Sequence, residues 1–221
     1  TGVTRGFPAC TQRSDVVSNP NPTIFHDKFV KLMRKSRQEA AETRQRIVDA
    51  ASKRFRESGI DSTALADLMA QAGLTHGGFY KHFESKEQVV LEALQLALES
   101  MRESLNQKMA HTSGSRSVNT AIANYLSPKH RDDPGGGCFF VALASELARS
   151  SGEIRDTATA GMVALIELIA SHLTDLPPAA AKKKALVIVS TMIGALTVSR
   201  LVNDEQLSAA VLREARKALQ Q

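Results

Sequence analysis

Apolar residues recur at helical spacing along the chain from about residue 39 to its end. Between Glu39 and Ser58 the apolar positions fall on one helical face, and Gly59 follows as a stop signal. Those positions are Ile47, Val48, Ala51 and Phe55. The alternation that marks a half-buried strand is missing. The pattern predicts an all-α protein.

The same spacing predicts the other helices. A short helix covers 65–72, a second short helix ends at Phe83, and Ser85 is placed to cap a long amphipathic helix to about Ala110. Ser62 and Thr63 are candidate N-caps of the first short helix. Later helices are expected at 117–126, 138–149, 153–173, 179–202 and 204–219. Glycines and prolines at 134–137 and 177–178 mark loops.

Residues 1–36 show no clear periodicity and contain three prolines. We expect a mostly irregular, basic extension with a short helical turn around 25–33. Its basic residues could form an arm that reaches the minor groove of DNA. A solubilising tail is the alternative.

Positive charge is concentrated in the first part of the chain. Residues 1–86 contain 14 Lys and Arg against 9 Asp and Glu, a net charge of +5, whereas residues 87–221 contain 14 of each. A basic segment joined to a neutral one indicates a phosphate-bearing partner at one end. A solvated basic surface would have the same composition.

The sequence does not favour a disulfide-rich protein, a zinc protein or an enzyme. Two cysteines, Cys10 and Cys138, make no disulfide framework, and no Cys/His spacing suggests zinc. Nucleotide-binding, serine-hydrolase and zinc-protease motifs are missing. We therefore expect no catalytic residue, no metal and no cofactor. The first 21 residues lack the apolar core of a secretory signal, and a reducing, cytoplasmic setting fits.

The apolar stretch 185–202 is long enough to resemble a membrane span. However, it contains Arg200 and several small or hydroxyl-bearing residues. The sequence has no second stretch of this kind. A helix covered by a core and a second subunit explains it better, so no membrane partner is expected.

The segment 64–83 carries the strongest functional signal. Gly73 supplies a left-handed turn between two short helices, and Leu74 fills the gap between them. This is the arrangement of a helix-turn-helix, whose second helix enters the major groove of DNA. Thr75 stands where an N-cap would offer its hydroxyl and free N–H groups to phosphate.

In the second short helix, Phe79 and Phe83 are four residues apart and should face the core. The two glycines Gly77 and Gly78 lower the stability of a helix. A close approach of the backbone to DNA would compensate for this loss of stability. The side chains left to point outward are His76, Tyr80, Lys81 and His82. Taken singly, each could be an ordinary surface residue.

These residues resemble the TetR family of transcriptional regulators in type and order. The matching segments are Asp67-Leu68-Met69, Ala72-Gly73-Leu74-Thr75, Phe79-Tyr80-Lys81-His82-Phe83 and Ser85-Lys86-Glu87. The resemblance covers about 43–101 in motif detail and only the order of helices beyond. It implies a DNA-binding domain at 37–86 and a helical effector-binding and dimerisation domain at 87–221.

By this resemblance a set of residues faces DNA. Those expected at the phosphate backbone are Thr75, Tyr80 and Lys86. Those expected nearest the base edges are His76, Gly78 and Lys81. The set is completed by Thr63, Gly77 and His82. Ala64 and Ala66 depart from the family, which often has Thr and Arg there, so the operator cannot be inferred by analogy.

The resemblance also implies a dimer and a ligand cavity. The helices at 153–173 and 179–202 are long and apolar enough for a four-helix bundle between two subunits, with a monomeric core as the alternative. Flexible and aromatic side chains suit an adaptable cavity, although each could be plain core. The candidates are Met101, Leu105, Tyr125, Phe139, Phe140, Met162, Leu165 and Met192.

Cys138 follows three glycines at the start of a predicted helix, where N–H groups and the helix dipole favour a thiolate. It could line the cavity and sense electrophiles or oxidants, or it could be a small core residue.

The resemblance to the TetR family therefore implies a homodimeric regulator that binds double-stranded operator DNA, most simply as a repressor. By the same resemblance, a small apolar or electrophilic effector would release it by shifting the long helix 85–110. An architectural DNA-binding protein without an effector is the alternative.

Overall fold

The computed structural model describes residues 1, 2, 22–110, 112–150 and 152–220. All regular structure in these ranges is helical, which confirms the all-α prediction. The chain forms two compact units, residues 1–41 and 42–221, which are considered separately.

The first unit holds the beginning of helix α1, Pro22–Ser58. The prediction of an irregular segment is wrong for 22–36, because these residues are helical. Proline suits a first helical turn, and no glycine or proline interrupts 23–58. Residues 33–42 are exposed, so this stretch has no apolar face from which periodicity could be recognised. Cys10 and the rest of 3–21 lie outside the described residues.

The second unit begins with a small helical group, called the head below: the end of α1, α2 (Leu65–Gln71) and the 3₁₀-helix η1 (His76–Lys81). Its core consists of side chains that are less than 5% exposed: Ile47, Val48, Ala51, Phe55, Leu68, Met69, Phe79 and Phe83. All four apolar positions predicted between Glu39 and Ser58 are therefore buried.

Helix α3, Lys86–Met109, follows the head. The Ser85 hydroxyl accepts a hydrogen bond of 3.2 Å from the backbone N–H of Gln88, so the predicted cap is confirmed. The rest of the unit, called the body below, comprises α4 (Gly114–Tyr125), α5 (Pro128–Arg131), α6 (Phe139–Arg149), α7 (Gly152–His172), α8 (Pro178–Leu201) and α9 (Glu205–Leu219).

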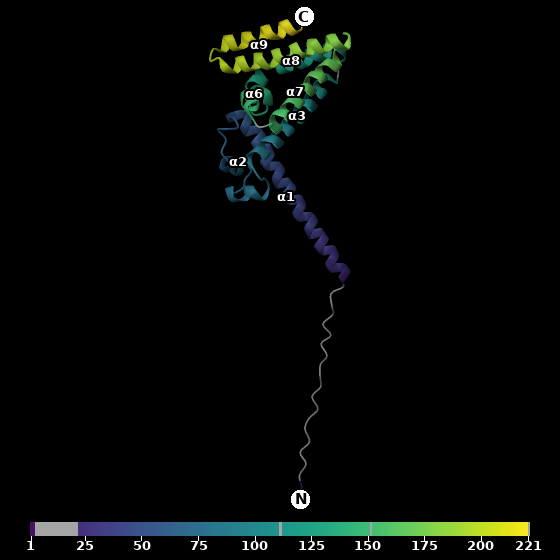
Figure 1. Cartoon of the computed structure of the whole chain (residues 1–221), viewed down its shortest axis with the longest axis vertical. Helices are drawn as coiled ribbons and strands as arrows, with labels where there is room; N and C mark the ends of the chain where they lie inside the picture. The colour runs from purple at the N-terminus through teal and green to yellow at the C-terminus, as the bar shows by residue number, and fades with distance from the viewer. Residues whose placement is uncertain (3–21, 111, 151, 221) are drawn as a thin grey trace. The chain divides into compact units, whose positions relative to one another are not determined.

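In the body, α8 and α9 lie side by side (Figure 1). Helix α3 packs against α4 and α7. The predicted helices of the body agree with the structure to within three residues at each end. The short helix α5 was not predicted, since four residues give no periodic signal. Helix α8 is long and apolar enough to span a membrane, but Ala185, Ile188, Val189 and Met192 pack into the core.

Candidate DNA-binding surface and ligand cavity

The turn between α2 and η1 is built as the sequence predicts. Gly73 has a φ of +73°, a left-handed conformation that suits glycine. The backbone N–H of Leu74 donates to the Met69 carbonyl at 2.8 Å, and the Leu74 side chain packs against the core. These contacts fix the angle at which η1 leaves α2.

The second helix of the motif was predicted as a short helix ending at Phe83, and it is a 3₁₀-helix that ends at Lys81. The two glycines weaken the preference for an α-helix, and short segments often adopt the tighter form. Phe79 and Phe83 are 0% and 2% exposed, and their rings stack with centroids 5.6 Å apart. The predicted inward face is therefore confirmed.

The opposite side of η1, called the η1 face below, is open to solvent. Its exposed residues are Thr75, His76, Gly77, Tyr80 and Lys81, while Gly78 and His82 are half-buried. The Tyr80 side chain is 67% exposed, with its ring edge-to-face on Phe79 at 5.2 Å. Thr75 occupies the N-cap, but its side chain makes no capping hydrogen bond. Donors for phosphates and bases are thus gathered on one short segment.

Thr63 and Lys86 differ from expectation. Thr63 is 1% exposed and its hydroxyl donates to the Gly59 carbonyl at 2.6 Å, so its side chain is not available to DNA. The N-cap of α2 is Ala64, which has no hydroxyl, and not Ser62 or Thr63. Lys86 is half-buried, and its ammonium donates to the Ile60 carbonyl at 2.6 Å.

Arg44 holds the head together, and sequence reasoning missed it. Its Nε lies 3.1 Å from Glu92 Oε2 on α3, its Nη2 contacts Glu92 Oε1, and its Nη1 donates to the His82 carbonyl at the end of η1. The guanidinium also stacks on the Phe83 ring, 4.1 Å from the centroid. A single side chain of α1 thereby fixes both η1 and α3.

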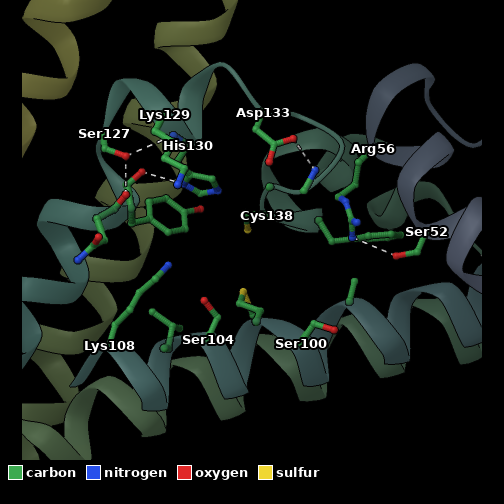
Figure 2. A pocket seen from close by; sticks show the side chains of 18 of the residues that line it. Ser52, Arg56, Ser100, Ser104, Lys108, Ser127, Lys129, His130, Asp133 and Cys138 are labelled. Carbon is green, nitrogen blue, oxygen red and sulfur yellow. Dashed lines mark hydrogen bonds between the residues drawn. The ribbon is translucent and has the colours of Figure 1, made fainter. Parts of the chain in front are cut away.

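A cavity of about 500 Å³ lies where the end of α1 meets the body. Its walls come from α1, α3, α4, α5, the loop that precedes α6 and the first residue of α6. In Figure 2, Ser100, Ser104 and Lys108 project from α3 toward Arg56, Asp133 and His130 on the other side, with Cys138 between. A volume of this size suits a small-molecule ligand.

Five predicted cavity residues line it: Met101, Leu105, Tyr125, Cys138 and Phe139. Phe140 and Met192 do not, because they are buried in the core, and Met162 packs beside that core. Successive residues of a helix point about 100° apart, so Phe139 and Phe140 cannot face the same space. Leu165 lines a separate groove between α3 and α7 with Met101.

The cavity is more polar than the sequence predicts. Its wall carries Arg56, Lys108, Lys129 and His130, two carboxylates (Asp49 and Asp133) and several hydroxyls. No pattern in the sequence predicts that Arg56 lies here, because the end of α1 belongs to the predicted DNA-binding domain. The expected apolar lining is therefore only one part of the surface.

Arg56 reaches the cavity with a half-buried guanidinium. Its Nε donates to the Gly135 carbonyl at 2.6 Å and its Nη1 to the Ser52 hydroxyl at 3.0 Å. Burial lowers the pKa of Arg56, and Cys138, Asp133 and Glu57 oppose this shift. Within the described ranges no carboxylate lies at ion-pair distance from it.

Tyr125 and Cys138 lie close together in the opposite part of the wall. The Tyr125 side chain is 8% exposed, and its buried hydroxyl has no hydrogen-bond partner among the described residues. Burial raises the pKa of Tyr125 well above its usual value, and the neighbouring Cys138 adds to that shift. Cys138 is 4% exposed at the N-cap of α6. That it senses electrophiles remains a prediction.

The loop before α6 forms a tightly packed side of the cavity. Arg200 of α8 donates to the carbonyls of His130 (2.7 Å) and Arg131 (3.0 Å). A Cβ on Gly137 would lie 2.9 Å from the Asp133 carbonyl oxygen and 2.8 Å from Arg200 Nη2, so no larger residue fits. The glycines predicted as simple loop punctuation therefore have a packing role.

Helix α6 joins the cavity to the head. Cys138 and Phe139 line the cavity at its start. Two turns later, the Glu146 carboxylate accepts hydrogen bonds from the backbone N–H groups of Ile60 (2.7 Å) and Asp61 (3.1 Å), between α1 and α2.

The described residues contain no group of three His, Cys, Asp or Glu that could hold a metal ion.

Two sequence families match the chain. Residues 47–93 match the bacterial regulatory proteins of the tetR family, and residues 115–217 match the C-terminal domain of LmrA/YxaF-like transcriptional regulators. Among curated proteins, the HTH-type transcriptional regulator AcrR of Shigella flexneri is 41% identical over 66 residues, 30% of this chain and 31% of that protein. The HTH-type transcriptional repressor BepR of Brucella suis is 44% identical over 54 residues, 24% of this chain and 26% of that protein.

The matched segments thus span about a third of these relatives or less. A solved structure extends the likeness to the whole fold. The TetR transcriptional regulator from Chloroflexus aurantiacus superposes with a TM-score of 0.72 and 30% identity, covering 83% of this chain and 94% of that one. The chain therefore belongs to the TetR family, whose members are DNA-binding transcriptional regulators and not enzymes.

Proposed function

We propose that this chain is a homodimeric repressor that binds operator DNA through the η1 face and is released when a small molecule occupies the cavity. The single observation that carries the DNA-binding part is the η1 face itself. It exposes Thr75, His76, Tyr80 and Lys81 beside each other while Phe79 anchors the segment from below. A regulator of this kind acts where the DNA is, so we place it in the cytoplasm.

Gly77 supports a close approach of the backbone to DNA. A Cβ at Gly77 would have no atom within 4 Å, and its φ is not positive. Neither packing nor backbone conformation within the chain therefore requires glycine at this position. A DNA backbone lying against η1 supplies a reason, since a methyl group there would meet it.

A second subunit would cover apolar side chains on the body. Val163 of α7 and Leu186, Val187, Val198 and Leu201 of α8 are 43% to 79% exposed. These residues lie on the two helices expected to form the dimer, 153–173 and 179–202. A symmetric four-helix bundle would bury them and place two η1 faces about 34–36 Å apart, the spacing of successive major grooves.

The cavity is suited to control the head because both are built from the same elements. Asp49, Ser52 and Arg56 of α1 line the cavity, and α1 ends in the head. Helix α6 contributes Cys138 to the cavity and Glu146 to the α1–α2 loop. A ligand that favours another position of α1 or α6 selects a dimer whose heads no longer match the grooves.

Selection of binding sites from random duplexes tests this proposal. The purified protein should enrich a palindromic sequence, and a cell extract or small-molecule library should contain a component that releases it. A shallow preference without release would favour the architectural alternative. Sedimentation tests the dimer separately: Val187→Asp and Leu201→Asp should give folded monomers, and a wild-type monomer at micromolar concentration would contradict it.

A further inference from the structure

The Tyr125 hydroxyl is an unpaired polar group in the wall of the cavity. It is buried, and among the described residues it has no hydrogen-bond partner. The thiol of Cys138 lies next to it, but a thiol is only a weak hydrogen-bonding group. Unsatisfied buried hydroxyls are uncommon in folded proteins and destabilise them. A ligand atom that pairs with this hydroxyl would remove that destabilisation.

The Tyr125 ring is held in place by the segment that follows it. The His130 ring packs edge-to-face on it with centroids 4.6 Å apart, and His130 Nδ1 lies 2.8 Å from the Tyr125 carbonyl oxygen. Arg200 of α8 donates in turn to the carbonyls of His130 and Arg131. The hydroxyl is thus restrained before a ligand arrives, which lowers the entropic cost of binding to it. Because burial raises the pKa of Tyr125, the hydroxyl keeps its proton and offers a donor.

The charged groups of the cavity do not call for a charged ligand. Its carboxylates and ammonium groups belong to exposed residues, which are Asp49, Asp133, Lys108 and Lys129. The half-buried Arg56 donates to Gly135 and Ser52, with the charges of Asp133 and Glu57 nearby. Ions at exposed positions remain solvated and lose little when the cavity is filled.

The buried part of the wall suits an apolar molecule. Among the lining residues that the structure describes, the buried ones are all uncharged, and they include Ala97, Leu105 and Phe139. The buried Ser52 hydroxyl already donates to the Ala93 carbonyl at 3.3 Å and accepts from Arg56. The Tyr125 hydroxyl is therefore the polar group of this buried surface that a ligand is needed to satisfy.

We infer that the effector is an uncharged molecule with an apolar body and an oxygen acceptor, such as a ketone carbonyl, that binds the Tyr125 hydroxyl. This inference rests on the proposed role of the cavity and narrows the expected apolar effector to one with an acceptor. A molecule held there lies beside Cys138 at the start of α6, the helix whose Glu146 binds the α1–α2 loop.

The test compares ketones with alkenes of the same shape. Acetophenone, 2-acetylnaphthalene and 4-acetylbiphenyl, each paired with the compound in which C=CH₂ replaces C=O, are titrated into the full chain by calorimetry. The corresponding carboxylates are the charged probes. The variants are Tyr125→Phe and the control Thr120→Val, which removes a hydroxyl of α4 that does not line the cavity.

At least one ketone should bind the wild type, and Tyr125→Phe should weaken it about tenfold, whereas the matching alkene should bind both proteins equally. Each probe is compared between two proteins, so differences in probe hydration cancel. Thr120→Val should change neither affinity, and the matching carboxylate should bind more weakly than the ketone. Binding by no ketone at millimolar concentration, an equal effect of Tyr125→Phe on ketone and alkene, or tighter binding of the carboxylate would overturn the inference.

The ligand-free proteins provide a second readout. Because Tyr125→Phe loses no hydrogen bond among the described residues, its melting temperature without ligand should equal or exceed that of the wild type. A clearly lower melting temperature would show that the hydroxyl is already satisfied, for example by an ordered water, and would overturn the inference.

DNA binding is measured in the same preparations by fluorescence anisotropy, with and without ketone. Intact DNA binding without ketone binding overturns only the effector class. Ketone binding through Tyr125 in a protein that binds no DNA, or whose DNA affinity the ketone leaves unchanged, overturns the proposed function instead.

Discussion

The Glu146 carboxylate of α6 lies 2.7 Å from the backbone nitrogen of Ile60, in the loop between α1 and α2. The same oxygen accepts from Asp61 at 3.1 Å. A single acidic side chain thus satisfies two N–H groups in the loop between α1 and α2. Because α6 starts at the cavity, we expect a shift of this helix to reach the loop through Glu146.

Replacing Glu146 should uncouple the cavity from the head. We expect Glu146→Ala to lower the free energy of unfolding by about 1–3 kcal/mol, because two N–H groups lose a charged acceptor. It should also reduce the effect of a bound effector on operator affinity. Urea melts and anisotropy with and without effector measure the two effects. The exposed Glu153 of α7 provides the control, Glu153→Ala. Unchanged release in Glu146→Ala would rule out this route.

Arg44 should matter for DNA binding without contacting DNA. Removing it in Arg44→Ala leaves Glu92, the His82 carbonyl and the Phe83 ring without their shared partner, at a site about one-third exposed. We expect a loss of about 1–3 kcal/mol in stability and weaker operator binding. Arg102, which pairs with Glu99 on the surface of α3, is the matched control. Arg102→Ala should behave like the wild type, and an equal effect of both variants would contradict the role given to Arg44.

Two glycines should respond in opposite ways to alanine. In Gly77→Ala the added methyl group has no atom of the chain within 4 Å, and alanine has the higher helix propensity, so the free energy of unfolding should rise by up to about 1 kcal/mol. Operator affinity should fall, because the methyl group would lie against the DNA backbone. Gly137→Ala places a methyl group 2.9 Å from the Asp133 carbonyl, so stability should fall by about 1–3 kcal/mol. Thermal melts and anisotropy separate these effects. Tight operator binding by Gly77→Ala would exclude the backbone contact proposed for η1.

The contrast between these glycines shows where sequence reasoning succeeds. Gly73, Phe79 and Phe83 act within one short segment, so their spacing alone predicts a turn and an inward face. The same is true of Ser85, whose capping partner is three residues away. Local patterns of this kind predicted the helices and the η1 face.

Contacts between distant segments could not be predicted in this way. Arg44 and Glu92 are 48 residues apart, Arg56 and Gly135 are 79 apart, and Ile60 and Glu146 are 86 apart. In the sequence, the charged members of these pairs look like ordinary surface residues. They are Arg44, Glu92, Arg56 and Glu146. The cavity was predicted to be apolar for the same reason, since Arg56 reaches its wall only through the packing of α1 against the body.

Stability should fall on mild acidification because of His130. Burial lowers the pKa of His130; the hydrogen bond from Nδ1 to the Tyr125 carbonyl and the charge of Asp133 oppose this, whereas Arg200 and Lys108 reinforce it. The unfolded chain therefore binds a proton at higher pH than the folded chain. The stabilising contribution is complete above the unfolded pKa of about 6.5 and is lost as the pH falls toward the lower folded value.

Urea melts between about pH 7.5 and about pH 5.5 measure this contribution. His130→Asn keeps a donor near the Tyr125 carbonyl but cannot take up a proton, so stability should depend less on pH in this variant. An identical slope in His130→Asn and wild type would show that His130 does not titrate in this range.

The most direct test of DNA binding by the η1 face is the salt dependence of operator affinity in Lys81→Ala and Tyr80→Phe, measured by anisotropy on selected and random duplexes. Lys81→Ala should weaken binding and reduce the slope of log K against log salt by about 1, and Tyr80→Phe should weaken binding to both duplexes. Lys183→Ala, an exposed lysine of α8, should change neither. Wild-type affinities and slopes in both η1 variants would show that DNA binds elsewhere.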